Sequence, residues 1–400
     1  MSAGNDRGRR VAVQPDGKIL LSGTCFVSPS SYAFCLARYN ANGSLDNTFG
    51  NSGTTISPTG QAGGFVHENK SLAIQPDGKI VAGGSCRDGS ETDFCAARYN
   101  INGSLDANFG VGGRAITSLT HDVDTAYDLA IQTDGKIIMG GTCSTRMCLV
   151  RYKANGSLDL SFQGTGKVIA FMDLPPARSG HGIALQPDGK IILGGRCFAG
   201  GLNLFCVARF NTDGSLDASF NGTGSVVTVT ESSVAETYRT ALQPDGKILL
   251  AGTCSLNGDF FTYRFCVIRY NPDGSVDNSF NNGMQLLTMI GTANSTATVI
   301  ALQRDGKVIL AGPCSSGQQN AACLARYEGG PFGYQNCKPD LDGDGAFLAT
   351  TDALINMRVA LGITGDAVVN GITFPPTATR NTWPLIRDYL FTQCGMSLPQ

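Results

Sequence analysis

The sequence has no long hydrophobic run, and its charged residues are few and balanced. No stretch approaches the roughly 18 consecutive apolar residues of a membrane-spanning helix, so we expect no membrane span. The 30 basic and 32 acidic residues are interspersed, and the lack of a basic stripe argues against nucleic acid as a partner. A charged fraction of 16% is low for a cytosolic enzyme.

A secretory leader is also missing. Residues 1–10 are partly basic but contain no apolar stretch, so they do not read as a signal peptide. The 14 cysteines, in contrast, form an even set of close pairs, and this usage indicates an oxidising compartment. We therefore expect an extracellular or cell-surface protein whose native leader is absent from this chain. The alternative is a cytosolic protein with reduced thiols.

Glycine is abundant, with 52 residues, and the chain contains an internal repeat. The motif Gln-Pro-Asp-Gly-Lys recurs with Thr or Arg in place of Pro in two copies. Apolar segments of four to seven residues flank each copy, and their Asp-Gly or Asn-Gly boundaries are typical of short strands joined by tight turns. The six copies begin at Gln14, Gln75, Gln132, Gln186, Gln243 and Gln303.

Four short antiparallel strands in about 57 residues make the unit of a β-propeller blade. A solenoid is the alternative, but its repeats are typically about half as long. We predict an all-β, six-bladed β-propeller over residues 9–330, in which the sixth repeat lacks a fourth strand. An open edge of this kind makes head-to-tail self-association an expectation. The repeats lie near residues 9–59, 66–119, 125–173, 180–232, 236–291 and 296–328.

These motifs resemble those of the delta-60 repeat proteins, a bacterial family. The resemblance covers residues 9–328 and rests on Gln-Pro-Asp-Gly-Lys-Ile, Ala-Arg-Tyr-Asn and Asp-Gly-Ser-Leu-Asp-x-Ser-Phe, as in Asp213–Phe220. Membership of this family implies an exported, propeller-like body, and it implies no settled activity.

One pair of cysteines falls in each repeat and flanks the loop between the second and third strands. Cysteines that face each other across a non-hydrogen-bonded strand pair lie within disulfide reach. Zinc is an alternative, but it needs four ligands, and each repeat offers two thiols and no recurring histidine. Reduced core thiols are the other alternative. The predicted disulfides are Cys25–Cys35, Cys86–Cys95, Cys143–Cys148, Cys197–Cys206, Cys254–Cys266, Cys314–Cys323 and, in the C-terminal domain, Cys337–Cys394.

An arginine recurs on the third strand of every repeat, and in the first five repeats an aspartate follows eight residues later. The arginines could form an anion-binding ring. Their co-recurrence with aspartate favours instead a structural clamp on the aspartate-bearing turn of the same or the next blade. Arg326 lacks such an aspartate and is expected to be unpaired. The predicted clamps join Arg38, Arg98, Arg151, Arg209 and Arg269 to Asp46, Asp106, Asp159, Asp217 and Asp277.

The composition changes after Gly333, and residues 334–400 are expected to form a small helical domain. Its segment Asp340-Leu-Asp-Gly-Asp-Gly reads as the first half of an EF-hand loop, in which alternate carboxylates and a glycine turn converge on one hard cation. An acidic turn that holds no ion is the alternative. The expected calcium ligands are Asp340, Asp342, Asp344, the carbonyl oxygen of Ala346, and Asp352, which stands one position beyond the usual twelfth.

This tail resembles the dockerin-type calcium modules at the ends of secreted and surface proteins. The resemblance covers Cys337–Cys394 and rests on the acidic loop and on Thr351-Asp-Ala-Leu. It implies a docking or attachment module, although only one calcium loop is recognisable.

Two functions compete. The first is a secreted or surface-attached binding or structural protein with a protein or glycan ligand; the second is an extracellular propeller enzyme such as a glycosidase, lyase or quinone dehydrogenase. Enzymes on this fold place single, non-repeating acids, histidines or tyrosines around the central channel. Here the conspicuous polar residues repeat, and the three histidines have no consistent partner. We therefore identify no catalytic residue and favour binding or structure. The histidines are His67, His121 and His181.

Overall fold

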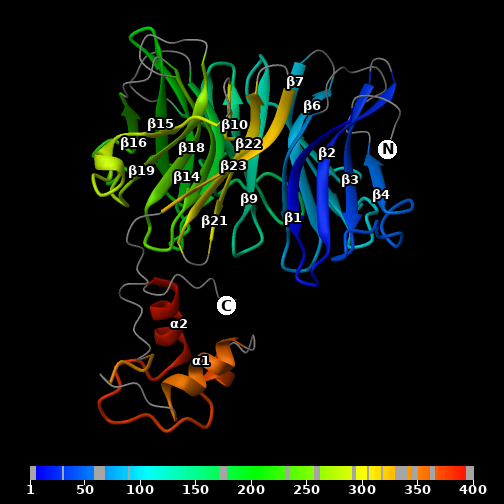
Figure 1. Cartoon of the computed structure of the whole chain (residues 1–400). Coiled ribbons are helices and arrows are strands. Elements are labelled where there is room, and N and C mark those ends of the chain that lie inside the picture. The colour runs from blue at the N-terminus through cyan, green and yellow to red at the C-terminus, as the bar shows by residue number, and fades with distance from the viewer. Residues whose placement is uncertain are drawn as a thin grey trace.

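The computed structural model confirms the predicted six-bladed β-propeller. Its strands form six antiparallel sheets, one for each repeat, and each sheet follows chain order (Figure 1). Five sheets have four strands, and the sixth has three among the described residues, as expected from the sequence. The structure describes residues 6–28, 31–57, 68–88, 91–170, 178–229, 234–255, 262–290, 294–303, 306–316, 319–328, 341–344, 350–360 and 365–392.

The bounds of the strands match the four segments expected of each repeat. The first sheet contains β1 (Arg7–Val13), β2 (Ile19–Ser28), β3 (Ser31–Tyr39) and β4 (Thr54–Ser57); the second β5 (Glu68–Ile74), β6 (Ile80–Asp88), β7 (Glu91–Tyr99) and β8 (Arg114–Thr117); the third β9 (Asp124–Ile131), β10 (Ile137–Cys143), β11 (Arg146–Tyr152) and β12 (Lys167–Ile169). The fourth contains β13 (Arg178–Leu185), β14 (Ile191–Ala199), β15 (Leu202–Phe210) and β16 (Ser225–Thr228); the fifth β17 (Ala235–Leu242), β18 (Ile248–Cys254), β19 (Arg264–Tyr270) and β20 (Leu286–Thr288); the sixth β21 (Val299–Leu302), β22 (Val308–Ser316) and β23 (Gln319–Tyr327).

The repeated motif forms the turn between the first and second strands of each sheet. In the first copy the amide of Gly17 donates to the carbonyl oxygen of Gln14 at 2.9 Å, and the Asp16 carboxylate accepts from the amide of Lys18 at 3.1 Å. Gly17 has a φ of +81°, which glycine adopts without a steric penalty. The motif therefore fixes the register of each strand pair.

The six first strands surround the axis, because β1, β5, β9, β13, β17 and β21 contact one another in this order. Between successive sheets lie five apolar cores, built from the second and third strands of both neighbours. The core between the first two sheets, for example, joins Leu20, Phe34 and Leu36 to Ile80 and Ala97. Among the described residues no such core joins the sixth sheet to the first.

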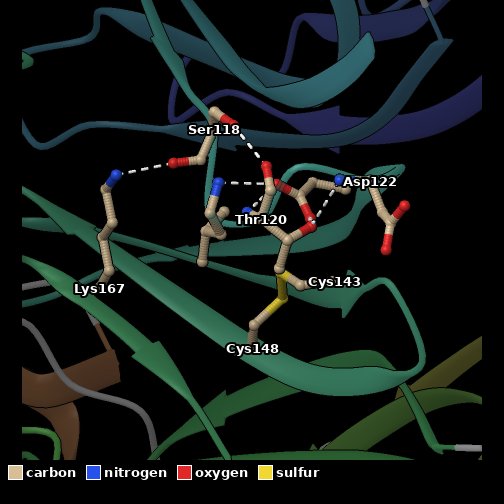
Figure 2. Close-up of a disulfide and its surroundings, with 8 residues drawn as sticks. Ser118, Thr120, Asp122, Cys143, Cys148 and Lys167 are labelled. Atoms are coloured by element: carbon tan, nitrogen blue, oxygen red, sulfur yellow. Dashed lines mark hydrogen bonds between the residues drawn. A yellow bond between two sulfur atoms is a disulfide. The ribbon is translucent and has the colours of Figure 1, made fainter.

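The six predicted disulfides inside the repeats are present, with Cα–Cα distances of 5.4 to 6.0 Å. Figure 2 shows the bond between Cys143 and Cys148 at the end of the hairpin of β10 and β11. The predicted register was wrong, because the two cysteines are diagonal neighbours: Cys148 faces Gly141, and Cys143 faces Arg146. Cys337 and Cys394 lie outside the described residues.

Two helices with a core of their own lie near the C-terminus. They are α1 (Asp352–Ala360) and α2 (Trp383–Thr392), and two short 3-10 helices, η1 (Asn281–Gly283) and η3 (Gly365–Val368), complete the elements. None of the helices in the described part of the chain is long and apolar enough to span a membrane. The core of this part contains Leu341, Ile355, Val359, Val368, Trp383, Ile386 and Leu390.

Candidate functional site

The two ends of the propeller differ: the repeated motifs lie at one end, and loops that vary among the repeats lie at the other. At one end, the turn rim, lie the Gln-Pro-Asp-Gly-Lys turns and the arginine–aspartate pairs. At the other end, the variable rim, the first strands begin and the second strands reach their cysteines. The hairpin loops on the variable rim differ among repeats, because the paired cysteines are separated by 10, 9, 5, 9, 12 and 9 positions. Recognition sites commonly lie on variable loops that a rigid scaffold positions.

On the turn rim, each of the five arginines meets the aspartate of its own repeat. The Nε–Oδ2 distances are 2.7 Å for Arg38–Asp46, 2.8 Å for Arg98–Asp106, 2.7 Å for Arg151–Asp159, 2.6 Å for Arg209–Asp217 and 2.6 Å for Arg269–Asp277.

Four of these arginines, those of the first four repeats, also donate to a carbonyl oxygen of the next sheet, so they contact both of the predicted partners. Arg38 Nη1 donates to the carbonyl oxygen of Ile101 at 2.6 Å, and Arg209 Nη1 donates to that of Pro272. The Arg209 guanidinium also lies 4.7 Å from the centroid of the Phe220 ring. Since these guanidinium groups are buried and fully engaged by the protein, they do not present an anion-binding ring.

In the first five repeats, the lysine of the Gln-Pro-Asp-Gly-Lys turn also contacts the aspartate of the arginine–aspartate clamp. The sequence did not reveal this contact. Lys190 Nζ lies 3.0 Å from Asp217 Oδ2, and Lys79 Nζ lies 2.9 Å from Asp106 Oδ2. Burial raises the pKa of Asp217, but hydrogen bonds from Ser219 and Lys190 and the charge of Arg209 outweigh it and hold the pKa well below its usual range. The turn rim is therefore a repeated structural device.

On the variable rim, five first strands carry a β-bulge at equivalent positions. Register shifts of the first strand against the second leave one extra residue in each. A bulge re-aims a side chain and is typical of functional positions. Here it breaks the repetition, because the five extra residues are of four different types, two cationic and three with rings. They are Arg9, Lys70, Tyr127, His181 and Tyr238.

These bulge residues contact one another across neighbouring first strands. The His181 ring lies 4.3 Å from that of Tyr127, tilted by 33°, and 5.9 Å from that of Tyr238, edge-on. Lys70 Nζ lies 4.2 Å from the Tyr127 ring centroid. Four first strands, from the second to the fifth sheet, thus bring their bulge side chains into one row at the axis.

Two glutamates and one arginine complete the row. Glu68 lies 2.9 Å from Lys70 Nζ and 4.0 Å from Arg9 Nη2. The Tyr238 hydroxyl donates to Glu236 at 2.8 Å, and Arg196 forms an ion pair with the same carboxylate. We call this set the channel cluster; it consists of Arg9, Glu68, Lys70, Tyr127, His181, Arg196, Glu236 and Tyr238.

A second layer ties the cluster together at the axis. Arg10 Nη2 of the first sheet lies 3.6 Å from Asp128 Oδ1 of the third, and Asp128 accepts a hydrogen bond from the amide of Ile183 in the fourth at 3.1 Å. Burial raises the pKa of Asp128, and Arg10 partly offsets this effect. The layer joins three sheets next to the bulges and fixes where the cluster side chains stand.

The rings of the channel cluster are uncharged near pH 7 and lie beside charged side chains. Burial, together with the cations Arg196 and Lys70, lowers the pKa of His181 to about 3, so its imidazole is neutral near pH 7. His181 Nε2 lies 2.8 Å from the Ser179 hydroxyl. Burial and Glu236 raise the pKa of Tyr238. The cluster thus combines three uncharged rings with three cations and two carboxylates.

Of the three histidines, only His181 belongs to the cluster, since His121 is not among its contacts and His67 lies outside the described residues. The sequence signal that could have revealed the channel cluster is one position in the repeat. Each bulge residue stands five places before the glutamine of its motif, where an otherwise repeated sequence changes in charge and ring content.

The acidic loop of the C-terminal part is only partly described, because Asp340 and Ala346 lie outside the described residues. Asp352 Oδ1 accepts the amide of Asp342 at 2.9 Å, and Asp342 Oδ1 accepts that of Asp344 at 3.1 Å. Asp342 is buried, and its Oδ2 has no hydrogen-bond partner among the described residues. Burial and the carboxylates of Asp352 and Asp344 raise its pKa. Within the ranges that the structure describes, no group of three or more His, Cys, Asp or Glu side chains is arranged to hold a metal ion.

Comparison with known proteins agrees with the fold. The model of a β-propeller domain of unknown function (DUF5122) matches residues 14–49, 75–109, 132–162, 186–220 and 243–280. No curated protein matches the chain in sequence.

Several solved structures are similar to this chain at low identity. They include an ulvan lyase (13% identity, 82% of this chain and 82% of that chain, TM-score 0.46), Sqt1 from Chaetomium thermophilum (12%, 82% and 70%, 0.43) and a protein of unknown function from Bacteroides caccae (11%, 71% and 82%, 0.38). At these values the likenesses carry no inference about ligand or reaction. With six sheets of one repeated unit, five of which match the DUF5122 model, the chain is a β-propeller repeat protein.

Proposed function

We propose that the protein is an exported binding protein whose ligand site is the channel cluster. The observation that carries this proposal is that five equivalent bulges hold four different residue types, whose side chains contact one another or a shared carboxylate near the axis. A purely structural repeat would have no reason to vary these positions in charge and ring content while keeping the bulge. The six disulfides support an oxidising, extracellular location.

The chemistry of the cluster suits an acidic saccharide. Tyr127, His181 and Tyr238 offer ring surfaces against which the C–H face of a sugar can pack. Lys70 and Arg196 flank the rings and can pair with a carboxylate or sulfate. We therefore propose a glycan ligand that carries negative charge, in preference to a neutral one.

Catalysis is the competing function, and the electrostatics favour binding. General acid–base catalysis works best with a pKa near the working pH. The pKa of His181 is about 3 and that of Tyr238 is raised, so neither ring is poised to exchange a proton near neutrality. We accordingly propose no catalytic residue. Incubation of the protein with a bound oligosaccharide should release no shortened product.

A glycan array of acidic and neutral oligosaccharides tests the ligand class. We expect acidic ligands to bind, and Lys70→Gln to weaken the best of them about tenfold or more, because a charge-assisted hydrogen bond contributes about 1.5–3 kcal/mol. Lys153→Gln removes an exposed lysine on the turn rim and should leave affinity unchanged. Equal binding by both variants would place the site elsewhere, and binding of neutral glycans alone would refute the acidic class.

We also propose that the C-terminal loop binds calcium and that this part serves as a dockerin-like attachment module. The buried Oδ2 of Asp342 supports the proposal, since an oxygen without a hydrogen bond beside further carboxylates is what a hard cation requires. Of the five expected ligands, Asp342, Asp344 and Asp352 are described, and backbone amide–carboxylate hydrogen bonds link Asp342 to the other two. The resemblance of the repeats to delta-60 proteins stays a prediction.

Titration calorimetry of the full chain tests the calcium site. We expect one binding event, and at a calcium concentration of 100 times Kd a stabilisation of the C-terminal part by about 2.7 kcal/mol. Asp342→Asn should weaken binding strongly, whereas Asp366→Asn, an exposed acid in η3, should not. Absence of binding heat in the unmodified protein would show that the loop is only an acidic turn.

A further inference from the structure

The five junctions between successive sheets follow one rule. One face of a sheet, carrying large apolar residues of its second and third strands, packs against the opposite face of the next sheet. Leu36 of β3 occupies this position in the first sheet and is 2% exposed; its counterparts Leu149, Val207 and Val267 are completely buried. The burial of these residues therefore shows how fully the next sheet covers this face.

The sixth sheet presents the same face without a partner among the described residues. Leu324 of β23 is the counterpart of Leu36, and it is 72% exposed. Arg326 corresponds to the clamp arginines, which are buried, yet its side chain is exposed and makes no hydrogen bond or ion pair with any described residue. We call Ile309, Leu324 and Arg326 the sixth-sheet face.

The first sheet presents the complementary face, also uncovered. Val11 and Val13 of β1 are 63% and 66% exposed, whereas Leu129 and Ile183, the counterparts of Val11 in the third and fourth sheets, are each 7% exposed. A pocket opens on the same side and is lined by Gly8, Leu21, Cys35 and Ala37, among others. Val11, Val13 and this pocket are the first-sheet face.

Polar groups at the two faces are complementary as well. At the junction of the first and second sheets, Arg38 donates to the carbonyl oxygen of Ile101, and the amide of Gly50 donates to that of Asn102. The counterparts of these acceptors in the first sheet are the carbonyl oxygens of Ala41 and Asn42, which no described residue uses. Arg326 is the matching donor at the other end of the chain.

From these observations we propose that a second copy of the chain docks its sixth-sheet face on the first-sheet face. The faces belong to the first and the last sheet along the chain, and both are exposed in the same molecule, so the described residues do not cover one with the other. Each face repeats a partner surface used five times within the chain. Because the contact joins two different surfaces, every added copy leaves one face of each kind free, and the association can continue.

Sedimentation and light scattering over a range of concentrations test the proposal. We expect species above the chain mass of 41.9 kDa that grow with concentration. Leu324→Arg and Val13→Arg should each give a monomer, because each blocks one face with a charge. Val111→Arg, at a valine that is 87% exposed on the turn rim, should associate as the unmodified chain does. Unchanged melting curves for the variants would exclude misfolding as the cause.

Mixing the two blocked variants gives the sharper result. Leu324→Arg retains its first-sheet face and Val13→Arg its sixth-sheet face, so the mixture should form a dimer and nothing longer. A double variant with Val13→Cys and Leu324→Cys should cross-link between copies on mild oxidation. A strictly monomeric chain at high concentration, or a cross-link within one chain, would overturn the proposal in favour of a ring closed on itself.

Discussion

Replacing Arg209 by alanine is expected to lower the free energy of unfolding by about 3–5 kcal/mol, the usual result of removing one partner of a buried ion pair. The change leaves Asp217 buried with only Lys190 opposite, and it removes the bond to the next sheet and the contact with the Phe220 ring. The matched change Arg326→Ala should alter stability by less than about 0.5 kcal/mol, because its side chain is exposed. Urea unfolding of both variants, below the concentration of self-association, makes the comparison.

The same clamp predicts how stability depends on pH. The folded pKa of Asp217 is depressed, so its pairing stabilises the protein above the pKa of about 4 that the unfolded chain shows, and this contribution disappears as the pH falls. Arg209→Ala should therefore lose less stability than the unmodified chain between pH 6 and about pH 2. Equal losses in both proteins, or an equal effect of the two arginine substitutions at pH 7, would contradict the clamp.

The sequence predicted the repeated part of the molecule because the information there is local and appears several times. A turn such as Gln14–Lys18 fixes one strand pair, and six copies fix six sheets. The disulfides followed because one pair of cysteines recurs in every repeat, and the clamps followed because arginine and aspartate recur eight positions apart. The motif lysine was missed as a clamp partner, because its approach to the aspartate, as in Lys190 and Asp217, depends on a strand register that spacing does not give.

The channel cluster could not be predicted in the same way, because its residues do not recur and lie far apart in the chain. His181 stood out in the sequence, but its ring contacts, Tyr127 and Tyr238, are separated from it by more than fifty positions. They meet because each first strand carries a bulge at the same height. The sequence shows the bulge only indirectly, through a glycine in the second strand.

That glycine leads to the largest expected local effect. The third-strand cysteine of each repeat faces a glycine, and in the first five repeats a Cβ atom added there would meet the carbonyl oxygen of the first strand just before the bulge. A Cβ atom on Gly195 would lie only 1.9 Å from the carbonyl oxygen of Ser179. Since this neighbour is backbone, no side-chain rotation relieves the clash. The equivalent glycines are Gly23, Gly84, Gly141, Gly252 and Gly312.

Gly195→Ala is therefore expected to destabilise the propeller by about 3 kcal/mol or more, at the upper end of overpacking substitutions. It should also displace Ser179 and His181 and so weaken ligand binding at the channel cluster.

Gly8→Ala is the matched control. The nearest neighbour of an added Cβ atom there is the flexible Leu21 side chain at 3.3 Å, and the equivalent positions of other repeats are occupied by Asn69 and Ala126. Thermal unfolding and ligand titration of both variants decide the matter. If Gly195→Ala unfolds at the same temperature as the unmodified protein and binds its ligand equally well, the close approach of the first strand to Gly195 does not determine the geometry of the channel cluster.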